Sequence, residues 1–305
     1  MTRFLIRRLL MFVPTLWIIG SLAFVLVRLA PGGPFLSERE IPAAARTQLA
    51  HAYGLDRPLS EQYLRFWGNA LHLDLGPSYK YPGRQVREII AEALPVSMEL
   101  GGWALLVALA FGVPIGVIAA LRQNTGWDYA AMGLALAGVS IPNFVLGPLL
   151  VLVFALTLYV FPPALWQGAS SRVLPVVTLA TAYVAYVARL TRAGMLEVLR
   201  QDFVRTARAK GLAERVVVAK HALRLGILPV VSYVGPAAAR ILMGSVVVET
   251  IFEVPGLGRY LVNAAFNRDY TLVLGEVLFY AGFLMVLNLL VDVAYAWLDP
   301  RVELA

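Results

Sequence analysis

The 305-residue chain contains no cysteine, which excludes disulfide bonds, thiolate metal sites and a cysteine nucleophile. Charge is also scarce, because Asp, Glu, Lys and Arg make up only 15% of the chain, whereas soluble domains contain about 25%. Hydrophobic residues account for 59%. This composition predicts an all-α integral membrane protein that crosses the bilayer several times.

Two enzyme signatures are absent as well. No glycine is followed by lysine, so the chain has no phosphate-binding loop of the G-x-x-x-x-G-K-[ST] type. The three histidines, His51, His72 and His221, form no H-E-x-x-H motif and fall outside the apolar segments. We therefore expect no catalytic residue and no metal site, which disfavours an intramembrane hydrolase. If this protein uses ATP energy, another chain must supply the ATPase.

Six apolar segments are long enough to cross a bilayer, which requires about 20 helical residues. The first is uncharged from Leu9 to Val27, longer than the apolar core of a signal peptide, which is about 7–15 residues. Residues 129–171 are all uncharged, and Pro162-Pro163 should end the one helix that we place there. The spans are expected at about 9–27, 100–121, 131–160, 173–195, 226–249 and 272–297.

An even number of spans puts both termini on one side of the membrane. The short loops on the other side hold few Lys or Arg residues, which places the termini in the cytoplasm. The expected domains are an N-terminal transmembrane helix (1–30), an extracytoplasmic segment (31–94), a core domain (95–298) and a cytoplasmic tail (299–305).

The polar segment 31–94 carries seven basic and seven acidic side chains. Pro42 is expected to begin a short helix that Gly54 ends. A second helix is expected after Pro58, with Ser60 as its N-cap and Gln62 on its exposed side. The segment is interpreted either as a small packed cap or as a docking surface for a partner.

Two patterns inside the apolar segments make further predictions. Gly112 and Gly116 form a small-xxx-small pair, which lets a neighbouring helix approach closely. Arg240 lies inside the fifth span, where a charge is costly, so it should face protein or water. It is interpreted as a structural partner of Glu276 or Asp292, as a side chain that extends to the outer membrane surface about two turns away, or as a residue on the wall of a translocation path.

The basic residues gather in one loop. Between Arg189 and Arg224 there are nine Lys or Arg residues and three Asp or Glu, which marks a cytoplasmic loop. Asp202 is the expected N-cap of a short helix at 203–210, and Gly211 its stop. A second helix is expected at 213–225. The pattern allows a loop that only orients the protein beside lipid headgroups, or a rigid two-helix projection.

The sequence of this loop resembles a known family. Phe203–Leu212 reads FVRTARAKGL, which is similar to the Tyr-Val-Arg-Thr-Ala-Arg-Ala-Lys-Gly-Leu run of ABC importer permeases in the peptide/nickel branch. The general importer pattern has a leading Glu and a final Pro. Here Arg205 and Arg224 stand at those positions, as in the peptide/nickel branch.

The resemblance extends over nearly the whole chain. Family-type motifs occur at Arg28-Leu-Ala-Pro-Gly32, Leu75-Gly-Pro-Ser78, Pro95-Val-Ser97, Pro255-Gly-Leu-Gly258, Asn267-Arg-Asp-Tyr270 and Leu298-Asp-Pro-Arg301. Others resemble the B-type permease subunits of oligopeptide importers: Pro34-Phe35, Gly76-Pro-Ser-Tyr-Lys80, Arg122-Gln-Asn-Thr125, Trp127-Asp-Tyr129 and Ser232-Tyr-Val-Gly-Pro236.

The resemblance implies a type I importer permease that transports oligopeptides or, alternatively, dipeptides, nickel or glutathione. It implies a homologous second permease subunit, two ABC ATPases that bind ATP and Mg, an extracytoplasmic peptide-binding protein, a bacterial or archaeal cytoplasmic membrane, and no nucleic acid. The loop 200–225 would couple to the ATPases. The coupling residues implied are Arg205, Thr206, Ala207, Arg208, Ala209, Lys210, Gly211 and Leu212.

A secondary transporter is the alternative from another class. It would require broken helices in internal repeats, or ionisable residues that form a relay through the membrane. Glu99, Arg240, Glu276 and Asp292 are the candidates for such a relay, and three of them lie near expected span ends. Uptake that an ion gradient drives without ATPase partners would favour this class.

Overall fold

The computed structural model describes residues 2–30, 47–48, 51 and 53–298. Within these residues the chain is built from helices and connecting turns, with an isolated antiparallel bridge between Pro77 and Gln85. Two compact units are present, the first formed by residues 1–96 and 256–305 and the second by residues 97–255. The long helix α4 (Val86–Leu121) contributes its first turns to the first unit and the remainder to the second.

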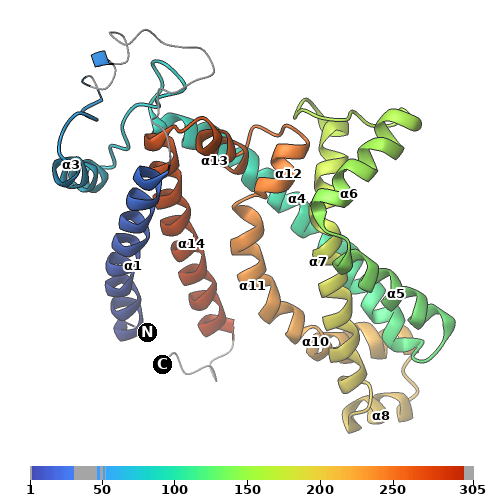
Figure 1. The fold of residues 1–305 in the computed structure, drawn as a ribbon. Coiled ribbons are helices and arrows are strands. Elements are labelled where there is room, and N and C mark those ends of the chain that lie inside the picture. Colours follow the sequence, from blue (N-terminus) through green and yellow to red (C-terminus); the bar gives the residue numbers. More distant parts are fainter. Residues whose placement is uncertain (1, 31–46, 49–50, 52, 299–305) are drawn as a thin grey trace. The chain divides into compact units, whose positions relative to one another are not determined.

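The helices divide between the two units as follows (Figure 1). The first unit contains α1 (Thr2–Leu29), α3 (Leu59–Leu71), the start of α4, α13 (Leu257–Phe266) and α14 (Tyr270–Leu298). The second contains the rest of α4, α5 (Gly126–Ser140), α6 (Asn143–Leu150), the π-helix η1 (Val151–Thr157), α7 (Ala169–Val198), α8 (Asp202–Ala209), α9 (Glu214–Val216), the π-helix η2 (Val217–Ala222), α10 (Leu223–Gly226), α11 (Leu228–Leu242) and α12 (Val246–Ile251).

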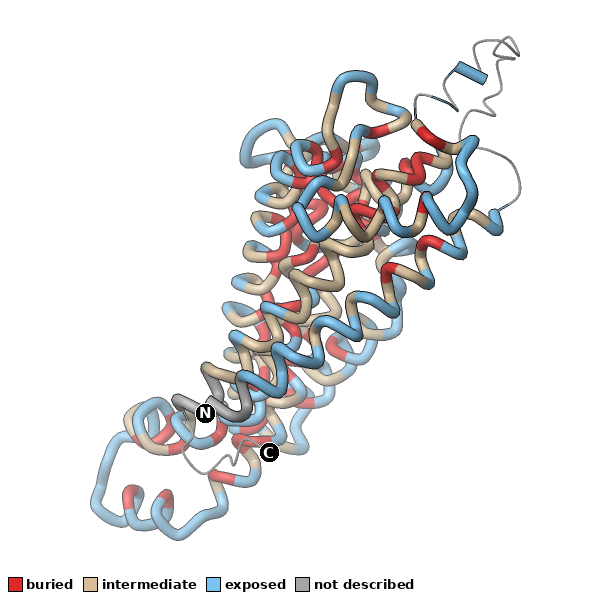
Figure 2. Tube along the Cα trace, turned by 90° about the vertical axis from the view of Figure 1, so that its left-hand side faces the viewer, coloured by how far each residue is buried: buried red, intermediate tan, exposed pale blue. Residues whose placement is uncertain are grey.

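Membrane-length helices dominate the chain, as the composition predicts. Five helical segments are long and apolar enough to cross a bilayer: Ile6–Leu29, Val86–Leu121, Ala169–Val198, Leu228–Ile251 and Tyr270–Val293. Exposed residues run along much of the length of these helices (Figure 2), and many of them are large and apolar. Lipid or other membrane helices must cover such surfaces, because the exposure of large apolar surfaces to water is unfavourable.

The span expected at 131–160 is not one continuous helix. The segment forms two helical pieces, residues 126–140 and 143–157, which are bent by 104° at a short break. Pro142 causes the break, because a proline disfavours the helical conformation of the residue before it. Ile141 is accordingly extended, with φ −85° and ψ 114°. Counted as one span, the bent pair brings the number of possible crossings to six.

In the first unit, α1 packs against α14 and α13 packs against α14. The start of α1 and the end of α14 lie at the same end of their pair (Figure 1), where Arg8 Nη2 lies 2.7 Å from Asp292 Oδ2. A second cluster buries the start of α4 against α13 and α14 through Val86, Ile89, Leu257 and Leu272. These contacts hold together segments that are distant in the sequence.

A buried carboxylate fixes the loop at residues 74–85 to the start of α14. Asp269 is fully buried and accepts hydrogen bonds from the Ser78 hydroxyl, the backbone N–H groups of Tyr79 and Lys80, the Thr271 hydroxyl and the backbone N–H of Leu272. Because a buried charge is costly unless it is hydrogen-bonded, these donors compensate its desolvation. We call this arrangement the Asp269 anchor.

Two expectations for the polar segment need correction, and one cannot be judged. Helix α3 begins at Leu59, so Ser60 lies inside it, and no side chain caps its N-terminus. Gln62 is only 9% exposed, because its amide donates to the carbonyls of Leu55 and Arg57 and closes the preceding turn. Most of the helix expected at 42–54 lies outside the described residues.

In the second unit, the close approach expected at Gly112 and Gly116 is confirmed. A β-carbon at Gly112 would lie 2.7 Å from Val187, and one at Gly116 would collide with the Ala188 carbonyl. Helix α7 therefore packs directly on the backbone of α4. Arg192 of the same helix forms a two-pronged ion pair with the buried Asp128 of α5, with N–O distances of 2.6 and 2.7 Å.

Candidate functional site

The basic loop between α7 and α11 folds into two short helical pieces. Helix α8 covers Asp202–Ala209, one residue earlier than expected at its start. Gln201 occupies the N-cap position in an extended conformation, so Asp202 is the first helical residue and not the N-cap. An acidic residue in the first turn still favours the helix, because it faces the positive end of the helix dipole.

Gly211 ends this helix in the way the sequence predicts. Its φ is +75°, in the left-handed region, and its N–H donates to the Arg208 carbonyl at 2.9 Å. A residue with a β-carbon is strained at such a φ, whereas glycine adopts it freely. No other part of the described chain lies within 4 Å of the position that a β-carbon would take. The glycine therefore gives a sharp turn and leaves open space beside it.

The second piece runs without interruption from Glu214 to Gly226, through α9, η2 and α10. It matches the expected helix at 213–225, except that residues 217–222 are π-helical. At its end, Gly226 packs on Gly194 of α7 so closely that a β-carbon on Gly194 would collide with the Gly226 carbonyl. The sequence analysis did not find this contact, because glycines 32 residues apart carry no helical spacing.

Apolar side chains attach α8 to the body of the second unit. Val204 and Ala207 are buried, and they belong to a cluster that includes Val217, Val218 and Ala222 from η2, Met195 and Val198 from α7, and Ala120 from α4. Val204 and Ala207 lie three residues apart and thus share one face of the helix. This spacing turns the remaining face of α8 away from the cluster.

The outward face is polar and basic. Of the candidate residues 205–212, Ala207 is buried and all the others are exposed. Arg208 Nη2 lies 2.6 Å from Glu214 Oε1 and closes the turn around Gly211. Its guanidinium, through this hydrogen bond, lowers the pKa of Glu214 below its ordinary value. We call residues 202–226 the coupling element, after the role that the family resemblance implies for them and that stays a prediction.

Arg240 does not belong to this element. It is exposed on α11, close enough to Tyr183 and Tyr233 to interact with them electrostatically. The expected pairing of Arg240 with Asp292 has a competitor, because Asp292 forms its ion pair with Arg8. Among the described residues of the second unit, Arg240 makes no ion pair. Its role stays a prediction.

Comparison with known proteins identifies the family. Residues 112–304 match the model described as "Binding-protein-dependent transport system inner membrane component", and residues 1–101 match the model of the N-terminal part of such membrane components. The oligopeptide transport system permease protein OppB of Salmonella typhimurium and that of Escherichia coli are each 46% identical over 305 residues, 99% of this chain and 100% of theirs. The dipeptide transport system permease protein DppB of Bacillus subtilis is 44% identical, with 100% and 99% covered.

Solved structures agree at the level of the fold. The MetNI methionine ABC transporter in an inward-facing conformation matches with a TM-score of 0.54 at 15% identity, over 71% of this chain and 97% of that one. An amino acid ABC transporter matches with a TM-score of 0.50 at 18% identity, over 71% and 95%. With both family models and these full-length relatives in agreement, the chain belongs to the inner membrane permease components of binding-protein-dependent ABC transport systems.

Proposed function

We propose that this chain is a permease subunit of an ATP-driven importer of oligopeptides. The similarity to OppB over the full length supports this substrate class. Similarity to a dipeptide permease is nearly as high, so dipeptides are the second candidate. In either case the chain would form half of the path through the membrane, and a homologous permease subunit the other half.

The proposed energy source lies outside this chain. Two ATPase subunits would bind ATP and Mg, and an extracytoplasmic binding protein would deliver the peptide. Closure of the ATPases around ATP would push on the coupling element, and the spans would shift between inward-facing and outward-facing states. Such a shift is driven by the higher affinity of ATP for one state than for the other. The termini and the coupling element would then lie in the cytoplasm.

The observation that supports this proposal is the structure of the coupling element, which is attached by apolar side chains on one face and exposed on the other. Val204 and Ala207 fix α8 to the membrane helices, while the residues around Gly211 project from it with open space beside them. A force applied to the exposed face would therefore reach α7 and η2 through a packed apolar cluster. A loop that only orients the chain beside lipid needs no such rigid attachment.

Gly211→Val tests this role in the assembled importer, with peptide-stimulated ATP turnover as the measurement. We expect assembly to be retained and the stimulation to be lost, because valine strains the turn by about 1–2 kcal/mol and fills the space beside it. Gly83→Val is the matched control: Gly83 has a φ of +77° and equally open surroundings, but it lies in the other unit. Normal stimulation in assembled Gly211→Val would remove Gly211 from the coupling role.

Arg240 is proposed as a residue of the path wall, since its side chain is exposed on a membrane-length segment. There it would attract the carboxylate of a passing peptide. Arg240→Glu should then leave a stable complex whose peptide transport is impaired. A destabilised complex that Glu276→Arg restores would instead identify a structural ion pair and reject the path role.

A further inference from the structure

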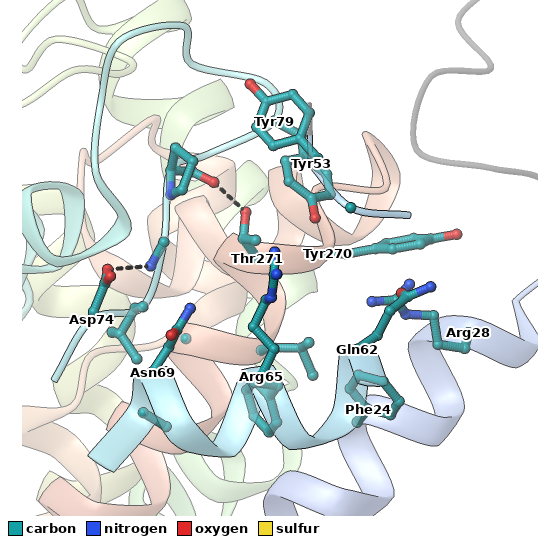
Figure 3. Close-up of a pocket in the computed structure, with 18 of the residues that line it drawn as sticks. Phe24, Arg28, Tyr53, Gln62, Arg65, Asn69, Asp74, Tyr79, Tyr270 and Thr271 are labelled. Carbon is teal, nitrogen blue, oxygen red and sulfur yellow. Dashed lines mark hydrogen bonds between the residues drawn. The ribbon is translucent and has the colours of Figure 1, made fainter. Parts of the chain in front are cut away.

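The first unit contains a pocket at the end of α1. Residues from α1, the turn at 53–57, α3, the 74–85 loop and the start of α14 line a cavity of about 230 Å³. Figure 3 shows Arg28 reaching into it from α1 and Arg65 from α3, below Tyr270 and Thr271. Three arginines line this cavity (Arg28, Arg57 and Arg65) with one acidic residue, Asp74. We call it the Arg28 pocket.

Arg28 has hydrogen-bond donors that a ligand could satisfy. Its guanidinium carbon lies 4.9 Å from the centre of the Phe24 ring and 5.2 Å from that of Tyr270. The rings stabilise a cation but accept no conventional hydrogen bond, and a guanidinium has five N–H donors. Among the described residues Arg28 makes no ion pair, and its buried Nε has no hydrogen-bond partner. A buried donor without an acceptor costs about 1–3 kcal/mol.

The remaining charges leave the pocket positive. Arg57 and Arg65 share one carboxylate, Glu61: Arg57 is hydrogen-bonded to it, and Arg65 Nη2 is 4.0 Å away, at the limit of an ion pair. The carboxylate of Asp74 accepts a hydrogen bond from the Gly76 N–H at 3.0 Å. Counting Glu61 as well, three arginines face two acidic groups, so the pocket keeps an excess positive charge.

The position of the pocket along α1 indicates that an anion bound there comes from a lipid headgroup. Arg28 is in the last turn of α1, which is uncharged from Leu9 to Val27 and contains a segment, Ile6–Leu29, long enough to span the bilayer. The preceding turns expose Leu22, Val25 and Leu26 on the side that α14 and α3 leave open, so that side of the helix suits hydrocarbon up to this level. Lipid headgroups begin where the hydrocarbon ends. Arginine binds phosphate oxygens with two parallel N–H donors.

From these observations we propose that the Arg28 pocket binds a phosphate group, which a phospholipid headgroup supplies, and that the bound headgroup fastens α3 to the end of α1. Arg28 and Arg65 hold the phosphate from two different helices. Nothing in this proposal depends on the imported substrate or on the coupling element, because it requires only that α1 lies in a membrane.

Calorimetry on the full chain in its complex with its partner subunits, in an uncharged detergent, tests the pocket. The probes are dihexanoyl phosphatidylglycerol, dihexanoylglycerol (which lacks the phosphate) and inorganic phosphate. We expect saturable binding of the phospholipid and none of the diacylglycerol. Arg28→Gln and Arg65→Gln should each weaken binding at least tenfold. Arg87→Gln, which removes an exposed arginine outside the pocket, should leave it unchanged.

One further variant separates an effect on binding from an effect on stability. The comparison with inorganic phosphate distinguishes a lipid headgroup from free phosphate. Arg28→Lys keeps a cation between the rings but loses the fork of donors, so we expect an unchanged unfolding midpoint with several-fold weaker binding. Inorganic phosphate that binds as tightly as the lipid would support the phosphate site and name free phosphate as its source. Equal losses in Arg28→Gln and Arg87→Gln, wild-type binding in Arg28→Gln, or binding of the diacylglycerol would each overturn the proposal.

Discussion

The Asp269 anchor and the coupling element hold short polar segments against membrane helices in opposite ways. At the anchor, one fully buried carboxylate gathers five donors, from Ser78 to Leu272, and leaves the loop little freedom. In the coupling element, apolar side chains carry the attachment and the charges face outward. A buried polar network fixes one geometry. Apolar attachment leaves a polar face available for a partner.

An aspartate-to-alanine substitution in each region should give the largest difference in unfolding free energy. Asp269→Ala would leave several buried donors without an acceptor, and we expect a loss of about 3–5 kcal/mol in unfolding free energy. Asp202→Ala removes a carboxylate that is 95% exposed, and we expect a change within about 0.5 kcal/mol. Unfolding of the detergent-solubilised chain measures both. Similar losses in the two variants would contradict the contrast.

A medium effect should appear when the apolar attachment is weakened. Val204→Ala removes two buried methyl groups from the cluster, and we expect a cost of about 1–3 kcal/mol and faster hydrogen exchange in α8. Leu212→Ala removes a larger side chain, but Leu212 is 40% exposed. Its effect on exchange should therefore be smaller. If Leu212→Ala loosened α8 as much as Val204→Ala, the cluster would not be the main attachment.

The smallest effect is expected from the ion pair that closes the turn. Arg208 lowers the pKa of Glu214 in the folded chain, so the pair stabilises the turn above the ordinary carboxyl pKa of about 4.3. That contribution is lost as the pH falls through the lowered folded pKa. Exposed pairs are worth about 0.2–1 kcal/mol. Glu214→Gln should remove this pH dependence from the exchange rates of α8, and an unchanged pH profile would show that the pair contributes nothing.

The sequence predicts the coupling element well because its signals are local. Gly211 follows a short amphipathic helix and stops it, as expected, in a left-handed conformation. Outside this element, the four-residue spacing of Gly112 and Gly116 in α4 likewise predicts their close contact with a neighbouring helix. The Asp269 anchor could not be predicted, because three of its five donors lie about 190 residues from the carboxylate. Gln62 looked like a surface residue, since only the folded chain brings the two carbonyls to its amide.

The bent pair α5–α6 also limits where this part of the chain can lie. The last four carbonyls of any helix have no partner within it, and Pro142 has no N–H to offer the preceding turn. In hydrocarbon, main-chain oxygens without donors cost several kcal/mol each, so such a break exists in a membrane only against protein or water. The packing of α6 on α7 and α12 supplies protein on one side. Wherever the 104° bend lies within the hydrocarbon, its open side must therefore face another subunit or an aqueous cavity, and not lipid tails.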